Sequence, residues 1–165
     1  MQLNKSCEII LKDCMNLKNN ESCLIITDSR LKSIGFQLFK NSLKITKEVK
    51  LILIPIPETH GSEPSADVAK EMLKYDVILI PTTKSLSHTK ARHAAQKKGA
   101  RIASMPGITA EMMQSTLNVD FYKIRKSNNK LISKLKNKNK INIITKNGTN
   151  IKFYIKIFFT NNSSL

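Results

Sequence analysis

The chain of 165 residues is 41% hydrophobic, which is typical of a folded globular domain and excludes a disordered protein. No apolar run approaches the roughly 18 residues of a membrane span, and the first residues lack the layout of a signal peptide. The three cysteines, Cys7, Cys14 and Cys23, form no CxxC motif and, in the absence of an export signal, indicate a reducing cytoplasm. We therefore expect a cytoplasmic protein that is neither secreted nor membrane-bound. We expect all three cysteines to be core residues, since cysteine behaves as a small buried hydrophobe.

The formal net charge of +16 is concentrated toward the carboxyl terminus. Residues 1–122 hold 17 basic and 12 acidic side chains, whereas residues 123–165 hold 11 basic side chains and no acidic one. A basic surface can bind a phosphate backbone, but specific nucleic-acid sites favour arginine, and the chain has 24 lysines and four arginines. The excess of lysine, isoleucine and asparagine is typical of coding bias, which we favour over a nucleic-acid partner. A basic nucleic-acid binder that acts through residues 123–156 is the alternative.

Hydrophobic spacing predicts alternating helices and strands. Helical spacing occurs over residues 4–15, 29–44, 66–74, 88–98 and 120–137, with a short helix capped by Thr109. Short apolar runs predict buried strands at 23–27, 49–54, 76–80 and 100–105. This alternation predicts an α/β domain over residues 1–140, with a doubly wound, mainly parallel sheet in a three-layer flavodoxin- or Rossmann-like arrangement.

The pattern changes after residue 140. Two apolar runs, 141–145 and 150–159, flank an Asn-Gly pair that readily adopts the positive φ angles of a type I′ turn, which predicts a β-hairpin. Pairing across that turn places Ile144 opposite Ile151, and strand 151–159 then turns five large apolar side chains to one face. We expect residues 141–165 to begin a truncated second domain, and this strand to cause self-association.

Ligands of doubly wound sheets bind outside the carboxyl ends of the strands, and we expect the 84–92 and 105–109 loops to lie together at that edge. Segment 81–92 carries many hydroxyl and basic side chains. Free backbone N–H groups at the start of helix 88–98 favour a small anion or a carboxylate. His88 and Arg92 lie one helical turn apart, so both can face one cleft, and His88 is the candidate catalytic residue. The candidate substrate- or anion-binding residues are Lys84, Ser85, Thr89, Arg92, Pro106 and Gly107. A capped helix with solvated charges is the alternative interpretation.

Several motifs are missing from the sequence. There is no GxGxxG, GxxxxGK[ST] or GxSxG pattern, which weighs against nucleotide sites and a serine hydrolase elbow. The three histidines have no ligand spacing, so we expect no metal bound to this chain alone.

Two long segments, PTTKSLSHTKAR at 81–92 and GARIASMPGIT at 99–109, resemble the amino-terminal domain of the aminopeptidase T family of thermophilic metalloproteases. The resemblance extends over roughly residues 5–157. It implies a leucyl-aminopeptidase-like hydrolase that removes amino-terminal residues from peptides with the help of a divalent metal such as zinc, cobalt or magnesium. It also implies that the metal ligands lie in a carboxyl-terminal domain, so we expect this chain to be inactive by itself. The alternative is a non-catalytic α/β module that binds a small anion or carboxylate at the 84–92 loop.

Overall fold

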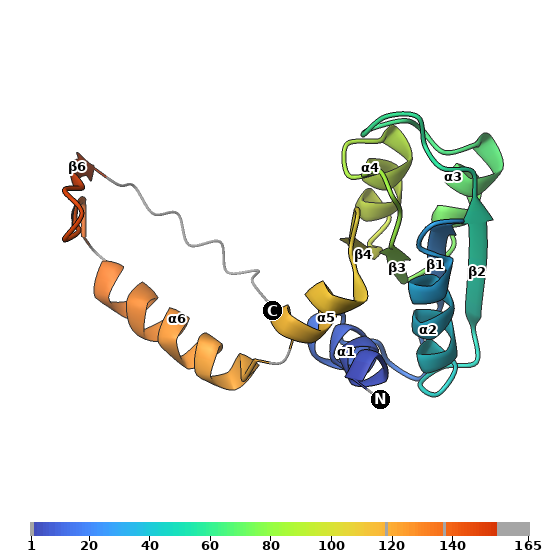
Figure 1. Cartoon of the computed structure of the whole chain (residues 1–165), viewed down its shortest axis with the longest axis horizontal. Helices are drawn as coiled ribbons and strands as arrows, with labels where there is room; N and C mark the ends of the chain where they lie inside the picture. Colours follow the sequence, from blue (N-terminus) through green and yellow to red (C-terminus); the bar gives the residue numbers. More distant parts are fainter. Residues whose placement is uncertain (1, 118, 137, 155–165) are drawn as a thin grey trace. The chain divides into compact units, whose positions relative to one another are not determined.

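The computed structural model describes residues 2–117, 119–136 and 138–154. Its contacts divide the chain after Val119 into two compact units, which we call unit 1 and unit 2 (Figure 1). The division falls before helix α6 (Phe121–Leu135), so this helix groups with the carboxyl-terminal hairpin and not with the α/β domain, which we expected to extend to residue 140.

Unit 1 contains the predicted parallel sheet. Its four strands are β1 (Cys23–Asp28), β2 (Val49–Ile54), β3 (Val77–Ile80) and β4 (Arg101–Ser104). They are arranged in the order β2-β1-β3-β4, and all three neighbouring pairs are parallel. The central strands β1 and β3 are buried along their whole length, as expected for continuous apolar runs, while β2 and β4 at the edges are partly exposed.

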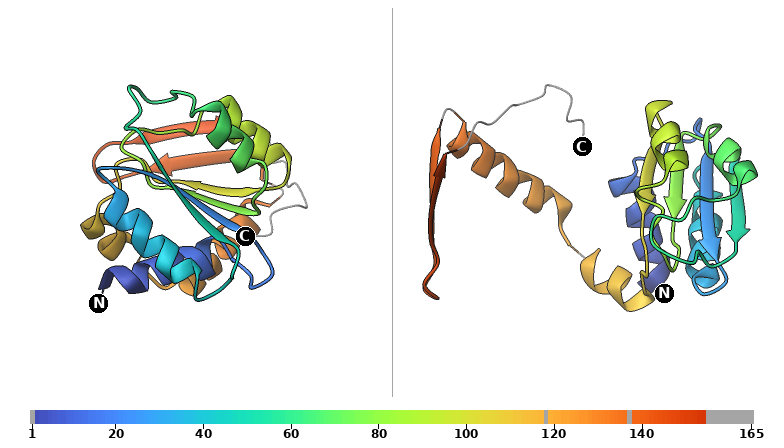
Figure 2. Two further views of the ribbon diagram at one scale, coloured as in Figure 1. Left: turned by 90° about the vertical axis from the view of Figure 1, so that its right-hand side faces the viewer. Right: turned by 90° about the horizontal axis from the view of Figure 1, so that it is seen from above.

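Helices cover both faces of this sheet, as the alternation predicted (Figure 2). Alternate residues of each strand enter two separate cores: Ile25 and Leu79 belong to one, and Leu24 and Ile78 to the other. The first core also holds side chains of α1 (Gln2–Ile9), α2 (Lys32–Ser42) and α5 (Ala110–Thr116). The second holds side chains of α3 (Ala66–Met72) and α4 (Lys90–Lys97). No helix in the described residues is long and apolar enough to cross a membrane.

The first predicted helix is split, and this corrects one expectation about the core. Residues Ile10–Cys14 form a π-helical turn, η1, in which the Met15 amide donates to the Ile10 carbonyl at 2.8 Å. The extra residue in this turn rotates the following side chains. As a result Met15 enters the core and Cys14 is exposed, although α-helical spacing predicted that Cys14 would be buried beside Cys7.

The hairpin of unit 2 consists of β5 (Lys140–Ile144) and β6 (Asn150–Tyr154), and its register differs from our prediction. Ile143, and not Ile144, lies opposite Ile151. The reason is the turn: only Gly148 of the Asn-Gly pair has a positive φ (95°), and its amide donates to the Thr145 carbonyl at 3.2 Å. A type I turn followed by a left-handed glycine gives a three-residue loop, which shifts the pairing by one residue.

The shifted register sorts the hairpin side chains by polarity. Four apolar residues share one face of the two strands: Ile141, Ile143, Ile151 and Phe153. The other face carries Lys140, Asn142, Asn150 and Lys152, together with the exposed Ile144 and Tyr154. The expected continuation of the second strand, residues 155–159, lies outside the described residues.

Candidate functional site

Asp28 ends strand β1 at the point where the strand order reverses, between β1 and β3. Its carboxylate is fully buried and accepts hydrogen bonds from the amides of Arg30 (3.1 Å) and Leu31 (3.2 Å). It also accepts from the amide of Thr83 and from the Thr83 hydroxyl at 3.0 Å. Four donors use the acceptor capacity of a carboxylate. Asp28 therefore ties the β1–α2 turn to the β3–α4 loop.

The β3–α4 loop is held from a second side by the loop that follows β2. The Ser85 amide donates to Nδ1 of His60 at 3.1 Å, and the Gly61 amide donates to the Ser85 carbonyl at 2.8 Å. The Ser85 hydroxyl donates to the Ser87 hydroxyl at 2.9 Å. These bonds make Ser85 and His60 positioning residues for the loop.

The amino-terminal end of α4 is already occupied by a carboxylate. Glu63 accepts from the amides of Lys90 and Ala91, the latter at 3.2 Å, while the Thr89 hydroxyl accepts from the Arg92 amide at 3.2 Å. The N–H groups that we expected to bind an anion are thus satisfied within the chain, by a residue that sequence reasoning did not single out. Glu63 lies 27 residues before Lys90, so no local spacing indicates this contact.

The position of Thr89 also changes the argument for a shared helix face. Thr89 has extended backbone angles (φ −79°, ψ 149°) and is the N-cap, so α4 begins at Lys90 and not at His88. His88 precedes the helix, and the one-turn spacing to Arg92 no longer places both side chains on one helical face. Thr89 itself is buried as a cap, and its hydroxyl donates to the Leu86 carbonyl at 2.8 Å.

The two loops that carry the predicted residues do lie at one edge of the sheet. The Met105 amide donates to the Ile80 carbonyl at 3.0 Å, and the Gly107 amide donates to the Thr82 carbonyl at 2.9 Å. This confirms the prediction that the 84–92 and 105–109 loops share an edge. Gly107 has a φ of 63°, and it and Pro106 are exposed where the chain turns toward α5.

Three predicted side chains remain free to meet a ligand at this edge. Within the described parts of the chain, Lys84, His88 and Arg92 make no side-chain hydrogen bond or ion pair; His88 is exposed and the other two are half-buried. Their chemistry suits an anionic group, because ammonium and guanidinium groups donate to carboxylate or phosphate oxygens. A ligand would be held here by side chains and not by the helix terminus.

The described residues do not suit a metal ion. No three His, Cys, Asp or Glu side chains among them lie together as a potential ligand set. The two carboxylates nearest to the loops, Asp28 and Glu63, already accept hydrogen bonds from the chain's own amides. A divalent metal would need ligands from outside this part of the chain.

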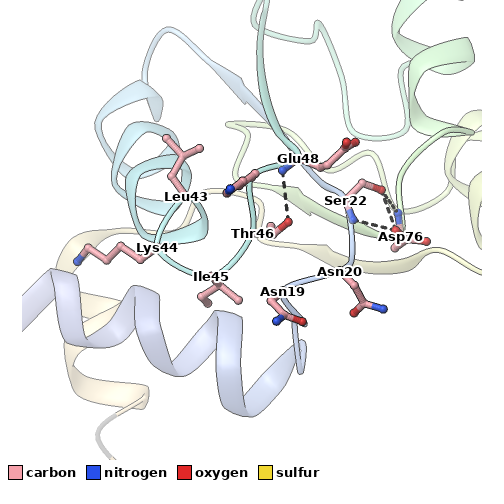
Figure 3. A pocket seen from close by; sticks show the side chains of 10 residues that line it. Asn19, Asn20, Ser22, Leu43, Lys44, Ile45, Thr46, Glu48 and Asp76 are labelled. Atoms are coloured by element: carbon pink, nitrogen blue, oxygen red, sulfur yellow. Dashed lines mark hydrogen bonds between the residues drawn. The ribbon is translucent and has the colours of Figure 1, made fainter.

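A hollow of about 660 Å³ lies at the opposite edge, where the strands begin (Figure 3). It was not predicted from the sequence. The Ser22 amide and hydroxyl each donate to Asp76 at 2.8 Å, and this lowers the pKa of the Asp76 carboxyl. The Thr46 hydroxyl donates to the Glu21 carbonyl at 2.7 Å. Several polar groups at this edge of the sheet form hydrogen bonds with one another, and these bonds hold the loops together.

Comparison of the sequence with protein-family models and with curated proteins gives no match. Among solved structures, the chain is similar to 2,5-dihydroxypyridine dioxygenase from Pseudomonas putida KT2440, with a TM-score of 0.67 and 14% sequence identity. The similarity covers 93% of this chain but only 47% of that one, so this chain spans about half the length of the protein it matches. At this identity the likeness shows the α/β fold alone.

Proposed function

We propose that this chain is the amino-terminal part of a metal-dependent aminopeptidase of the aminopeptidase T type and forms one wall of its peptide-binding cleft. One observation carries the proposal: the two segments that resemble the family, 81–92 and 99–109, form neighbouring loops at the carboxyl edge of the sheet, joined by the bond from Gly107 to Thr82. Segments that form a common binding surface are expected to lie together in this way.

The reaction class is peptide hydrolysis, in which a bound divalent metal would supply an activated water. The described residues offer no ligand set for such a metal, and in this proposal they contribute binding and orientation. In the proposed role Lys84 and Arg92 hold a carboxylate of the peptide, and His88 donates a further hydrogen bond from the exposed side of the loop. We place this activity in the cytoplasm, because the three free cysteines suit a reducing compartment.

The first test separates binding from turnover. We expect the chain alone not to hydrolyse leucine p-nitroanilide with added Zn²⁺, Co²⁺ or Mg²⁺. It should bind leucylglycine weakly in a calorimetric or NMR titration, and a His88→Ala, Arg92→Ala double variant should lose most of that affinity. Lys97→Ala, at the other end of α4, is the matched control and should bind as the wild type does.

Two outcomes would contradict the proposal. Turnover by the wild type that disappears in the double variant would show that this half carries catalytic residues of its own. Equal peptide affinities of the wild type and the double variant would show that the 84–92 loop does not line the peptide-binding cleft.

The second candidate is a non-catalytic module that binds a small anion at the 84–92 loop. The free Lys84 and Arg92 side chains favour it, because a cationic pair does not require a peptide. Inorganic phosphate that binds with higher affinity than leucylglycine and without any metal requirement would support this candidate over the aminopeptidase proposal.

A further inference from the structure

Helix α6 carries an exposed apolar stripe with the spacing of a coiled coil. Ile124, Asn128, Leu131 and Leu135 follow one another at intervals of four, three and four residues, which are the d, a, d and a positions of a heptad repeat. The Ile124 and Leu131 side chains are 44% and 57% exposed. The stripe is therefore open to a partner helix.

Three of the five basic side chains of α6 are kept away from this stripe, while Arg125 and Lys134 lie at the flanking e and g positions. Lys123, Lys126 and Lys130 fall at the c and f positions, on the side of the helix farthest from the a and d side chains. All three are exposed. A second copy of α6 that approaches along the stripe therefore meets apolar side chains without bringing these lysines together, even though unit 2 is strongly basic.

Two polar residues of α6, together with its N-cap residue, favour a parallel pair. Asn128 occupies the central a position, where an asparagine side chain can bond to the same residue of a second helix and fix the register. Asp120, the N-cap of α6, is at a g position, and Arg125 five residues later is at e. In a parallel pair these positions face each other across the seam. The Arg125 side chain makes no ion pair within the described residues, whereas Asp120 lies 3.8 Å from the Lys123 ammonium of its own helix. Charge complementarity thus indicates a second copy of this same helix.

We propose that α6 forms a parallel two-stranded coiled coil with α6 of a second copy, so that unit 2 makes the protein a homodimer. The hairpin supports this occupant. Its face of Ile141, Ile143, Ile151 and Phe153 is apolar throughout, with Lys140 and Lys152 on the reverse face, so two such faces pack without like charges meeting. The inference is independent of the proposed function, because it uses no residue of the 84–92 loop.

Sedimentation equilibrium of the full chain tests the proposal directly. At 0.15 M salt we expect a mass of twice 18.6 kDa that falls toward the monomer on dilution. Leu131→Lys should weaken the dimer at least about tenfold. Ser133→Lys adds the same charge at an f position of the same helix and should leave the association unchanged. A monomeric wild type, or equal effects of the two variants, would overturn the proposal.

Crosslinking provides a second test that does not depend on a destabilised variant. In a Cys14→Ser background, Asn128→Cys should form an intermolecular disulfide on mild oxidation, because the central a residues of a parallel pair are adjacent. Ser133→Cys should form no intermolecular disulfide under the same conditions. Crosslinking at residue 133 and not at residue 128 would contradict the proposed helix–helix contact through the a and d positions. A monomer that binds vesicles of phosphatidylserine or a DNA duplex through α6 would replace the second copy by another occupant.

Discussion

Gly35 lies where helix α2 packs closely against strand β1. A methyl group at this position would lie 2.6 Å from Cγ2 and 2.8 Å from Cβ of Thr27, a residue that is fully buried. Cβ is fixed to the strand backbone, so rotation of the Thr27 side chain cannot relieve the contact. The absence of a side chain at Gly35 therefore sets the distance between α2 and the sheet.

We predict that Gly35→Ala lowers the free energy of unfolding. Overpacking of a core costs roughly 1–3 kcal/mol, which exceeds the gain of about 1 kcal/mol from the higher helix propensity of alanine. Urea unfolding followed by circular dichroism measures the difference, with Ser33→Ala on the exposed side of α2 as the control. If Gly35→Ala were as stable as the wild type, the close approach of α2 to Thr27 would be wrong.

Single residues also mark where sequence patterns misled us. Cys14 fits the apolar spacing of an α-helix, but the π-helical turn at Ile10–Cys14 exposes it. The local sequence does not indicate a π turn, because the free-energy cost of the turn is offset by the packing of Met15 and Leu17 in the core. Buried Cys7 and Cys23, in contrast, were predicted correctly from the hydrophobic pattern.

At the scale of elements, helix α4 depends on a cap from a distant loop. Glu63 satisfies two amides of its first turn, and Thr89 satisfies a third. A carboxylate at a helix amino terminus also interacts favourably with the helix dipole. The loop after β2 and the start of α4 therefore stabilise each other.

We predict that Glu63→Ala destabilises unit 1 by about 1 kcal/mol, the usual cost of losing a helix cap. Glu58→Ala is the control, since it removes a carboxylate from the same loop, and within the described residues Glu58 makes no hydrogen bond or ion pair. Urea unfolding compares the two variants. Equal stability of both would show that the contact with Lys90 and Ala91 does not support α4.

At the scale of the whole molecule, ionisable groups limit stability at both ends of the pH range. Hydrogen bonds from Arg101 lower the pKa of the Glu21 carboxyl, and those from Ser22 lower that of Asp76. Lys50 and Lys74 lower the pKa of the half-buried Glu71 carboxyl to about 2. Burial raises the pKa values of the Cys7 and Cys23 thiols from 9.0 to about 11.

These shifts predict a plateau of stability between about pH 5 and pH 9. Carboxyls with a lowered pKa stabilise the folded state above their ordinary pKa, and this contribution is lost as the pH falls. Thiols with a raised pKa favour the folded state below pH 9.0, and stability decreases between pH 9.0 and about 11, by roughly 1–3 kcal/mol for each thiol. Urea unfolding across this range measures the profile. The Cys23→Ser variant should lose less stability than the wild type between pH 9.0 and about 11. An equal loss of stability in both proteins would contradict the role of the buried thiol.

The sequence by itself determined the α/β class, the four strands and the layering of helices on both faces, because periodicity of apolar residues is a local property that follows from burial. It also placed the 84–92 and 105–109 loops at one edge, since parallel strands share their carboxyl ends. Only the tertiary structure decided that α6 groups with the hairpin. It also decided that Glu63 accepts hydrogen bonds from the first amides of α4 and that Asp28 accepts hydrogen bonds from Thr83. These hydrogen bonds join residues 27 and 55 positions apart, where spacing along the chain carries no information. The hairpin register was likewise decided in three dimensions, because the turn at Gly148 and the sorting of apolar side chains to one face favour the same pairing.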